Sequence, residues 1–407
     1  MNVLLIAQYF WPESVGAGVW IHQLAIDLTQ KGHRVTVLTA FPNYPDGRVF
    51  TGYRNRILAR EDLDGIQVIR TYIYPATGKA FWPRAASFGS FCASALWAGL
   101  LASPPDVIYA ILPPLPLGWT AEFLGILKRA PVVVNIQDIH PDIAVSLGFL
   151  QNLTAIQFFQ KMERSIYRHA SAIVVIGDDF RQNLMGKGVP PEKIHVIPNW
   201  ADADVIRPAP KLNQFRAALG SNGNLLAVYS GGMGLNTCLD TVVEAARLLA
   251  GESHQFVLIG EGAHKESLEA RAKKYRLQNL RFLPFVAAEE YPQALASSDV
   301  QLVALNEAAT HSSLPSKLLK IMSSGRPVLA LARRESELSR LVERAGCGVT
   351  VAPGDAEGLA DAVRKLAQEP ELLEVMGERG RRYLLDNFDR GRCVAALESV
   401  LRQAAHA

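Results

Sequence analysis

The sequence contains few cysteines, and none of them is spaced to bind a metal or to build a disulfide scaffold. Among 407 residues there are four, with no CxxC motif: Cys92, Cys238, Cys347 and Cys393. Zinc knuckles and small disulfide-stabilised folds are therefore excluded. Each cysteine is expected to act as a small buried hydrophobic residue in a reducing compartment.

An excess of either charge is also absent. The chain has 42 Lys and Arg residues against 39 Asp and Glu residues, which leaves a net charge of +3. Nucleic-acid-binding domains usually concentrate basic residues on one face, so this balance argues against nucleic acid as a partner. The content of 49% hydrophobic and 20% charged residues is typical of a globular protein and excludes wholesale disorder.

Long hydrophobic runs are missing as well, and no secretory leader is expected in residues 1–8. No basic residue precedes the short apolar segment at residues 2–8, which is expected to be a first β-strand rather than a signal peptide. Residues 85–105 carry no charge, but they include serines, glycines and a closing Pro-Pro. Their continuous apolar core is shorter than the ~20 residues of a membrane span, so a buried or interfacial helix is expected.

Short apolar segments alternate with longer amphipathic ones along most of the chain, which indicates parallel sheets with crossover helices. The predicted strands of the first half are residues 2–8, 34–39, 67–72, 107–112, 132–137, 172–176 and 194–197. Those of the second half are residues 225–230, 255–259, 280–285, 300–305, 327–332 and 348–351. A proline-containing linker at residues 198–210 separates the halves. The predicted fold class is α/β, with two doubly wound Rossmann-like domains facing across a cleft and ligands beyond the carboxyl ends of the strands.

The loop after the first predicted strand contains two glycines, Gly16 and Gly18, just before a helix. Glycines at such a position let backbone N–H groups approach an anion closely. The third glycine of the dinucleotide fingerprint is missing, and no acidic residue ends the second strand. A Rossmann dehydrogenase is therefore disfavoured.

Three ionisable side chains follow the fifth predicted strand: Asp138, His140 and Asp142. Asp138 is nearest the strand end and is the candidate catalytic residue. His140 is a weaker candidate for substrate binding. Asp142 could serve the chemistry or simply cap the next helix, and the sequence leaves both alternatives open.

The second half repeats the glycine-rich pattern. Gly231 and Gly232 follow its first strand, and Gly260 with Glu261 ends the next, where a carboxylate could accept hydrogen bonds from ribose hydroxyls. Further on, Pro315 is expected to open a helix and to place Lys317 in the first turn, where a lysine opposes the helix dipole. A bound phosphate would explain that position.

Paired carboxylates that could hold a divalent metal occur twice, at residues 62–64 and 202–204. The first pair precedes Gly65 in a turn, and the second lies in the linker. Neither follows a core strand, so no metal and no other cofactor is expected.

Several motifs occur in a fixed order: the glycine-containing first loop, QD-x-x-PD, IPNW, YSG-x-x-G, G-E-G and LPSKLL followed by SSGRPV. Together they resemble retaining glycosyltransferases of the GT-B fold, family 4, and above all the bacterial colanic-acid and exopolysaccharide enzymes. The resemblance covers nearly the whole chain. It implies an acceptor-binding domain at residues 1–198, a nucleotide-sugar-binding domain at 199–388, and a last helix at 389–407 that packs back on the first domain.

The resemblance also implies a reaction, the transfer of a sugar from a nucleotide-diphospho-sugar to an acceptor hydroxyl with the anomeric configuration retained. Gly16 and Gly18 would lie beside the donor phosphates, and Asp138 near the reacting carbon. The donor diphosphate would be held by a second group of residues: Gly231, Gly232, Ser316 and Lys317. The departing diphosphate gains negative charge, which Lys317 would stabilise.

The chain departs from the family pattern at two glutamates, which would fall on Ser312 and Lys320. Whether Lys320 recognises the ribose is therefore open. Recognition of the sugar is open as well, with Glu307 or His311 as candidates to replace the first glutamate. Two alternative functions remain, a GT-B-fold nucleotide-sugar epimerase and a non-catalytic module that binds a sugar nucleotide.

Relatives of this kind commonly act on lipid-linked acceptors, so a lipid-linked or polysaccharide-precursor glycan is the expected acceptor. Basic and aromatic residues that could touch a membrane cluster near residue 80: Lys79, Phe81, Trp82 and Arg84. Three aromatic residues further on are expected in the core instead: Phe88, Phe91 and Trp97. The expected location is cytoplasmic, with peripheral contact at the inner face of the cell membrane.

Overall fold

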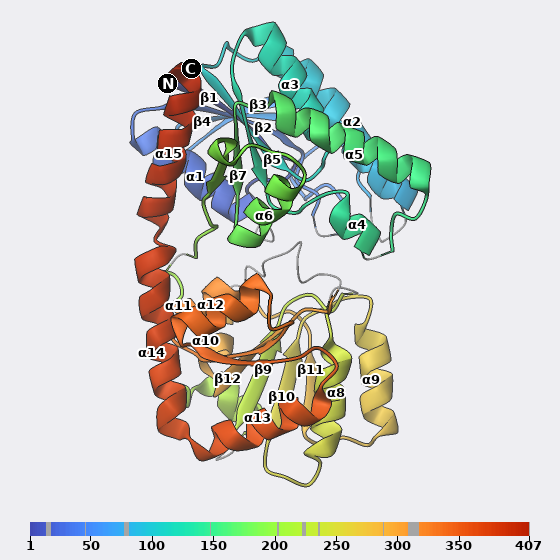
Figure 1. Ribbon diagram of the computed structural model, residues 1–407, viewed down its shortest axis with the longest axis vertical. Helices are drawn as coiled ribbons and strands as arrows, with labels where there is room; N and C mark the ends of the chain where they lie inside the picture. The colour runs from blue at the N-terminus through green and yellow to red at the C-terminus, as the bar shows by residue number, and fades with distance from the viewer. Residues whose placement is uncertain are drawn as a thin grey trace. The chain divides into compact units, whose positions relative to one another are not determined.

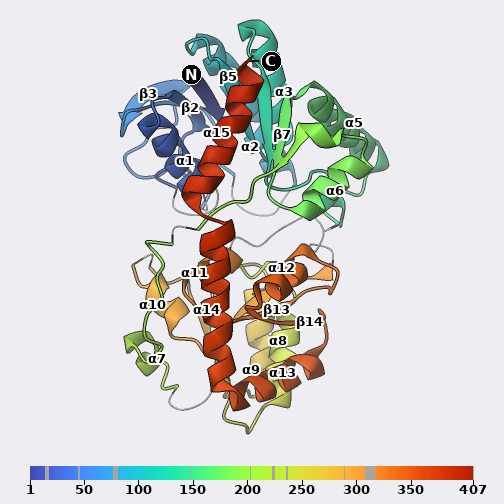
Figure 2. The same ribbon diagram turned by 60° about the vertical axis from the view of Figure 1, so that its left-hand side comes forward.

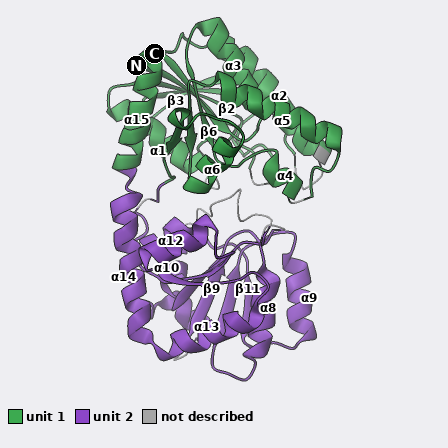
Figure 3. Ribbon diagram, in the orientation of Figure 1, with its two compact units in different colours: residues 1–199, 391–407 green, residues 200–390 purple. Residues whose placement is uncertain are grey.

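Figure 1 shows the computed structural model of the chain, which describes residues 1–13, 18–44, 46–76, 81–146, 148–201, 203–221, 225–234, 237–287, 289–307 and 317–406, apart from the side chain of Phe81. The chain divides into two compact units (Figure 3). Unit 1 comprises Met1–Asn199 and Gly391–Ala407, and unit 2 comprises Trp200–Arg390.

Unit 1 is built on an eight-stranded sheet with the strand order β3-β4-β2-β1-β5-β6-β7-β8. Its strands are β1 (Asn2–Ile6), β2 (Arg34–Ala40), β3 (Leu58–Leu63), β4 (Ile66–Thr71), β5 (Val107–Leu112), β6 (Val132–Ile136), β7 (Ala172–Val175) and β8 (Ile194–Val196). Of these eight described strands, β3 alone runs antiparallel to its neighbour, β4. The central strands are buried along nearly their whole length, which explains their uninterrupted runs of Val, Ile and Leu.

Helices cover this sheet and connect its parallel strands. They are α1 (Gly18–Gln30), α2 (Phe81–Leu101), α3 (Leu117–Lys128), α4 (Asp142–Ser146), α5 (Leu153–His169), α6 (Asp178–Gly186), the 3-10 turn η1 (Pro191–Lys193) and α15 (Arg390–His406). The uncharged segment predicted as a buried or interfacial helix is α2, which packs on β2, β4 and α3. Within the described ranges, no helix has the length and apolar character needed to cross a bilayer.

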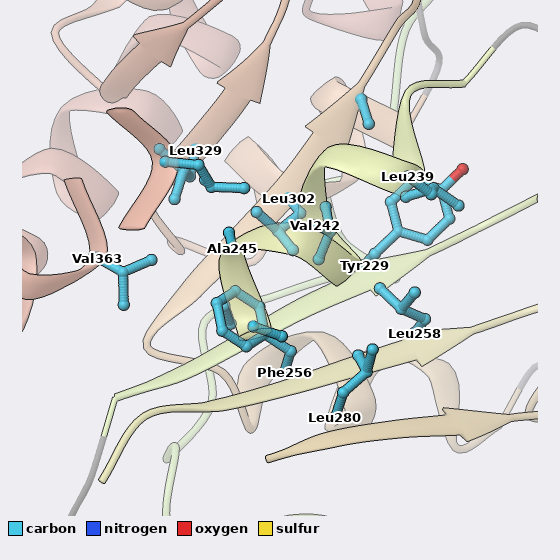
Figure 4. Close-up of a cluster of buried hydrophobic side chains, with 14 of the residues drawn as sticks. Tyr229, Leu239, Val242, Ala245, Phe256, Leu258, Leu280, Leu302, Leu329 and Val363 are labelled. Atoms are coloured by element: carbon cyan, nitrogen blue, oxygen red, sulfur yellow. The ribbon is translucent and has the colours of Figure 1, made fainter. Parts of the chain in front are cut away.

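Unit 2 has a six-stranded, fully parallel sheet in the order β11-β10-β9-β12-β13-β14. Its strands are β9 (Leu226–Ser230), β10 (Gln255–Ile259), β11 (Leu280–Leu283), β12 (Val300–Ala304), β13 (Val328–Leu331) and β14 (Gly348–Val351). Side chains alternate between the two faces. On one face, Phe256 and Leu258 of β10 pack with Leu302 and Val242 in the core shown in Figure 4.

The helices of unit 2 are α7 (Gln214–Ala218), α8 (Leu239–Leu248), α9 (Lys265–Lys274), α10 (Tyr291–Ala296), α11 (Lys317–Ser323), α12 (Glu337–Ala345), α13 (Ala356–Gln368) and α14 (Pro370–Asn387). Residues of the linker pack on this unit. Ser323 donates a hydrogen bond to the Ile206 carbonyl oxygen (2.6 Å), and Arg326 donates one to that of Ala209 (2.7 Å). The linker is thus held by side chains from α11 and the turn that follows it.

Both sheets are doubly wound, and this decides where ligands can bind. In unit 1 the chain begins at β1, which has β2 on one side and β5 on the other; in unit 2, β9 lies between β10 and β12. Connections leave the sheet in opposite directions at these two points, and in open parallel sheets ligands are expected beyond such strand ends, here beyond β1 and beyond β9. The glycine-containing loops singled out in the sequence follow these two strands.

The last helix, α15, belongs to unit 1 from Gly391 onward (Figure 2). Its Glu398 carboxylate lies 3.0 Å from Nε2 of His33 and 3.2 Å from Nζ of Lys31. The hydrogen bond from His33 and the neighbouring cations lower the pKa of Glu398 to about 2. This ion-pair cluster joins two ends of the chain that are far apart in sequence.

Every strand predicted from the sequence is present, with ends that agree to within two residues. The edge strand β3 was not predicted, because its side chains are partly or fully exposed and include charged residues, so its pattern is not that of a buried strand. The core placement expected for Trp97 is wrong, because 47% of this side chain is exposed, whereas Phe91 is buried as expected. Cys92, Cys347 and Cys393 are buried free thiols.

Candidate functional site

The loop after β9 begins with Gly231, whose backbone only glycine adopts readily. Its φ is +145°, and its N–H donates a hydrogen bond to the Ile259 carbonyl oxygen (2.9 Å). Gly232 follows with open space beside its Cα. Within the described part of the chain, no backbone carbonyl accepts a hydrogen bond from the Gly232 N–H. This amide is therefore available to a ligand.

The loop after β10 lies directly against the loop after β9. Gly260 and Gly262 have φ values of +146° and +155°, and a Cβ atom at either would overlap a carbonyl oxygen, that of Gly231 or of Met233. Met233 also donates a hydrogen bond to the Glu261 carbonyl oxygen (2.9 Å). The glycines thus extend the parallel pairing of β9 and β10 beyond the sheet and hold the two loops together.

Lys317, the first residue of α11, points its ammonium group at this loop pair. Its Nζ lies 3.7 Å from the centre of the Tyr229 ring, and a Cβ atom at Gly231 would lie only 2.8 Å from the same Nζ. No carboxylate of the described residues lies within ion-pair distance of it. Burial of the ammonium group lowers the pKa of Lys317 to about 7. A partly buried cation with no described carboxylate partner, beside the open Gly232 amide, is a candidate site for an anion.

Two tyrosines support this lysine and its neighbour on α11. The Tyr229 hydroxyl donates a hydrogen bond to the Gly232 carbonyl oxygen (2.6 Å), which couples the ring under Lys317 to the loop. Lys320 lies with its Nζ 5.4 Å from the centre of the Tyr291 ring, and the Tyr291 hydroxyl is 3.2 Å from that of Ser230. Both lysines therefore make cation–π contacts around the end of β9.

The other candidate side chains of unit 2 make no described contact with Gly231, Gly232 or Lys317. Glu261 is about half exposed and forms an ion pair with Lys265 (2.6 Å), so a ribose would compete with that lysine. Glu307 is exposed after β12. His311 and Ser316 lie outside the described residues. The structure thus brings Gly231, Gly232 and Lys317 together and leaves the ribose and sugar contacts as predictions.

In unit 1, Asp138 follows β6 by two residues and is partly buried. Burial raises the pKa of its carboxyl to about 7. Among the described residues, none donates a hydrogen bond to Asp138 or forms a salt bridge with it. A carboxyl group that titrates near neutrality can exchange protons with a substrate hydroxyl, which is the property of a general acid or base.

The residue before it, Gln137, belongs to a chain of amides that the sequence did not reveal. Gln137 and Asn199 exchange two hydrogen bonds, of 2.6 and 3.2 Å, and Gln137 also donates to Asn135 (2.5 Å). Asn135 in turn donates to the buried Tyr109 hydroxyl (2.7 Å). These bonds join the QD motif to the asparagine of the IPNW motif and fix the backbone next to Asp138.

His140 and Asp142 have different surroundings. Burial, and secondarily the charge of Arg84, lower the pKa of His140 to about 4, so its ring is neutral at pH 7. Asp142 forms an ion pair with Lys187 (2.9 Å) and accepts a hydrogen bond from Asn183 (3.0 Å). Asp142, the first residue of α4, therefore joins α4 to α6 and the residue that follows it, which is a structural role other than the helix cap considered from the sequence.

The first loop is held by two residues that the sequence pattern did not reveal. Buried Glu13 accepts hydrogen bonds from the N–H groups of Phe10 (3.1 Å), Asn43 (2.8 Å) and Tyr44 (2.8 Å). Buried Arg70 donates to the Trp11 carbonyl oxygen (2.7 Å). A charged residue within a mostly apolar strand, as Arg70 is in β4, is a signal that could have found it.

Gly18 begins α1, and a Cβ atom there would lie 2.6 Å from the Glu13 carbonyl oxygen. This glycine is therefore required for close packing of the loop. Gly16 lies outside the described residues. The role that the resemblance gives both glycines, beside the donor phosphates, stays a prediction.

The described carboxylates of the two DxD strings have partners of their own. Asp62 accepts a hydrogen bond from the Gly65 N–H (3.2 Å), Asp64 lies 3.4 Å from His22, and Asp204 pairs with Arg207 (2.7 Å). Asp202 lies outside the described residues. Within those ranges, no group of three His, Cys, Asp or Glu residues is placed to hold a metal ion.

Comparisons with known proteins settle the family. Residues 15–200 match the model of the glycosyl transferase 4-like domain, and residues 213–383 match that of the glycosyl transferases group 1. The chain belongs to the glycosyltransferases. The protein WcaI of Escherichia coli K12, named for a glycosyl transferase of colanic acid biosynthesis, is 29% identical over 94% of this chain and 96% of its own length. The expected glycosyltransferase family is therefore confirmed.

Solved structures confirm the fold of this glycosyltransferase. HepE of Anabaena, solved in complex with UDP-glucose, superposes with a TM-score of 0.72 at 16% identity, covering 99% of this chain and 100% of that one. WaaG, a glycosyltransferase involved in lipopolysaccharide biosynthesis, superposes with a TM-score of 0.69 at 17% identity, covering 98% and 99%. The fold is GT-B, and the comparisons give no support to the alternative of an epimerase.

Proposed function

We propose that this glycosyltransferase uses a nucleotide-diphospho-sugar as donor and transfers its sugar to a hydroxyl with the anomeric configuration retained. The observation that carries the proposal is Lys317, a half-buried cation with no described carboxylate partner, next to the open Gly232 amide at the end of β9. Breaking the anomeric bond leaves two negatively charged phosphates. Donors already aimed at that charge stabilise the transition state more than the ground state.

In unit 1, Asp138 would orient the acceptor hydroxyl near the reacting carbon. The Gln137–Asn199 amide pair fixes the backbone next to Asp138. The Asp138 carboxyl therefore loses little conformational entropy when it orients the acceptor. The phosphate of the donor would take the proton of the acceptor. Neither step needs a metal ion, and the described carboxylates of the DxD strings have other partners: Asp62 accepts a hydrogen bond from the Gly65 N–H, Asp64 lies beside His22, and Asp204 pairs with Arg207.

The acceptor we propose is a lipid-linked or polysaccharide-precursor glycan, met at a membrane surface. WcaI is named for colanic acid biosynthesis, and WaaG is involved in lipopolysaccharide biosynthesis. The patch expected near residue 80 agrees with such a contact in part, since Trp82 is 78% exposed and Arg84 is exposed. Lys79 and the side chain of Phe81 lie outside what the structure describes.

The test has two stages. Thermal unfolding in the presence of a series of nucleotide sugars identifies the donor, because a ligand of the native state raises the midpoint. The transfer product is then examined by NMR, where the coupling constant of the anomeric proton reports its configuration. A product with the configuration of the donor supports the proposal. An inverted product, or no stabilisation by any nucleotide sugar, would overturn it.

A further inference from the structure

A groove on unit 1, called here the α5–α6 groove, collects positive charge that the proposed reaction does not use. It lies between α5 and the segment that follows α6, and Figure 2 shows these two helices next to each other. Its volume is about 550 Å³, within the roughly 300–1,000 Å³ typical of small-molecule sites. Five of its lining residues are basic: Lys161, Arg164, Arg168, Lys187 and Lys193. None of the described residues that line it carries a carboxylate, so the groove attracts anions.

Three of these cations have no anionic partner in the described part of the chain. Lys161, Arg164 and Arg168 are exposed, and no described carboxylate lies within ion-pair distance of any of them. Their spacing of three and four residues puts them on one side of α5, where like charges repel one another. Arg164 donates from Nε to the Gln160 carbonyl oxygen (3.2 Å), while its two Nη groups make no described hydrogen bond. An anion among these side chains would relieve their repulsion.

Lys187 links the groove to the loop that carries Asp138. Its Nζ lies 2.6 Å from a carboxylate oxygen of the buried Glu163 and 2.9 Å from one of Asp142. Asp142 begins α4, which directly follows that loop. An anion in the groove would compete with Asp142 for the same ammonium group. A ligand there therefore reaches α4 through a single side chain.

The chemistry of the lining favours phosphate groups on a compact molecule. The guanidinium groups of Arg164 and Arg168 can each bond two phosphate oxygens at once. Three cations without partners call for more negative charge than one phosphate group, which carries about −1.5 to −2 at pH 7. Cations from α5 and from the segment after α6 converge on one ligand in the groove, whereas a bilayer presents its headgroups as a flat layer.

We propose that the α5–α6 groove binds a soluble molecule with two or more phosphate groups, and that this ligand loosens α4 by drawing Lys187 away from Asp142. The groove belongs to unit 1, whereas the site proposed for the donor diphosphate belongs to unit 2. The two are therefore separate sites. Binding at a second site that changes the loop of Asp138 is the arrangement needed for regulation by a ligand.

The first experiment is isothermal titration calorimetry of inorganic pyrophosphate with the full chain carrying Lys317→Met, which removes the cation proposed for the donor site. One pyrophosphate is expected to bind per chain, more weakly as salt is added. Arg164→Gln/Arg168→Gln in the same background should raise the dissociation constant at least about tenfold, because two charged hydrogen-bonding groups are lost.

The matched control is Arg281→Gln/Arg382→Gln, which removes two exposed arginines of unit 2. It should bind pyrophosphate as the Lys317→Met background does. Lys193 donates to the backbone carbonyl oxygen of Arg168 (2.8 Å), a bond that Arg168→Gln retains. All variants should therefore unfold at the temperature of the background when no ligand is present, so that weaker binding reports the groove rather than the fold.

Hydrogen exchange measures the coupling to α4 without relying on activity. The N–H groups of Ile143 and Val145 donate to the carbonyl oxygens of Ile139 and Pro141 (3.0 Å each). Pyrophosphate at a concentration that saturates the Lys317→Met protein should speed exchange of these amides roughly fivefold, the low end of the coupling typical between two sites. The same concentration should leave their exchange unchanged when Arg164→Gln/Arg168→Gln is also present.

Three outcomes would overturn the proposal. Absence of pyrophosphate binding, or binding that Arg164→Gln/Arg168→Gln leaves intact, rejects the site. Binding without faster exchange in α4 rejects the coupling through Lys187. Sedimentation with vesicles of phosphatidylcholine and phosphatidylglycerol that depends on Arg164 and Arg168, without any binding of pyrophosphate, identifies a lipid headgroup as the source of the phosphate and rejects a soluble ligand.

Discussion

The ammonium group of Lys317 lies 3.7 Å from the centre of the Tyr229 ring, and the hydroxyl of that ring donates a hydrogen bond to the carbonyl oxygen of Gly232. One tyrosine thus holds both the cation and the glycine loop of the proposed phosphate site. The ring offers its negative face to the ammonium group without neutralising it, as a carboxylate would. The cation remains available to a phosphate.

Replacing Lys317 by Ala should lower kcat by on the order of a hundredfold, because a charged contact to the departing diphosphate is lost. Steady-state kinetics with the identified donor measures this. Lys274→Ala removes an exposed lysine at the end of α9 and serves as the control. A near-wild-type rate for Lys317→Ala would mean that another group stabilises the leaving diphosphate.

Donor binding should take up a proton at pH 8. The pKa of Lys317 is lowered to about 7 by burial, so at pH 8 the free enzyme holds this side chain mostly neutral. A bound diphosphate favours the charged form and raises that pKa. Affinity is then highest below pH 7 and falls as the pH rises above it. Calorimetry in buffers of different ionisation enthalpy counts the proton, and Lys317→Met should abolish the uptake. Equal binding enthalpies in all buffers at pH 8 would contradict this.

Replacing Gly260 by Ala should destabilise unit 2 by about 1–3 kcal/mol or more, because the residue has φ +146° and a Cβ atom would overlap the Gly231 carbonyl oxygen. Gly232→Ala is the matched control from the same loop pair, since the space beside its Cα is open. Its effect should stay within about 0.5 kcal/mol. Thermal unfolding of both variants measures the difference, and equal midpoints would refute the packing role of Gly260.

Replacing Asp138 by Asn should lower kcat far more than donor affinity, by on the order of a hundredfold or more, if the carboxylate acts on the acceptor. Weakened donor binding with normal kcat would place Asp138 against the nucleotide instead.

The same variant should be more stable than the wild type at pH 7. Burial raises the pKa of Asp138 from 3.8 to about 7, so between these values the unfolded chain has lost a proton that the folded chain keeps. Wild-type stability therefore falls as the pH rises from about 4 to 7, by at most about 4 kcal/mol at about 1.4 kcal/mol per unit. In Asp138→Asn this decline should be reduced. Denaturant unfolding of both proteins at pH 5 and pH 7 measures the change in the free energy of unfolding between the two pH values. The same change in the wild type and in Asp138→Asn would refute the prediction.

Activity should survive treatment with EDTA. Among the described carboxylates of the two DxD strings, Asp62 is bonded within a turn, Asp64 lies beside His22 and Asp204 pairs with Arg207, so we expect the diphosphate charge to be met by Lys317 and the Gly232 amide. The measurement is the transfer rate before and after chelation. Loss of activity that Mn²⁺ or Mg²⁺ restores would show that a metal ion serves the donor.

The sequence by itself determined every strand except the exposed edge strand β3, and it located the glycine-containing loops that follow β9 and β10. Buried parallel strands need unbroken apolar runs, so the segment at residues 107–112 was predicted with the bounds that β5 has. Gly231 and Gly260 were marked as loop glycines because their positions follow such runs. These signals are local, since each lies within a few neighbouring residues.

Only the tertiary structure decided which side chains meet. The Tyr229 ring under Lys317, the Gln137–Asn199 amide pair and the Glu13 carboxylate bound to the Asn43 amide each join residues that are tens of positions apart. The exposure of Trp97 was decided in the same way, because the packing of α2 on the sheet and on α3 sets which side of the helix is covered. Local patterns carry no information on such pairings, since burial, pKa and hydrogen bonding depend on the surroundings that distant segments provide.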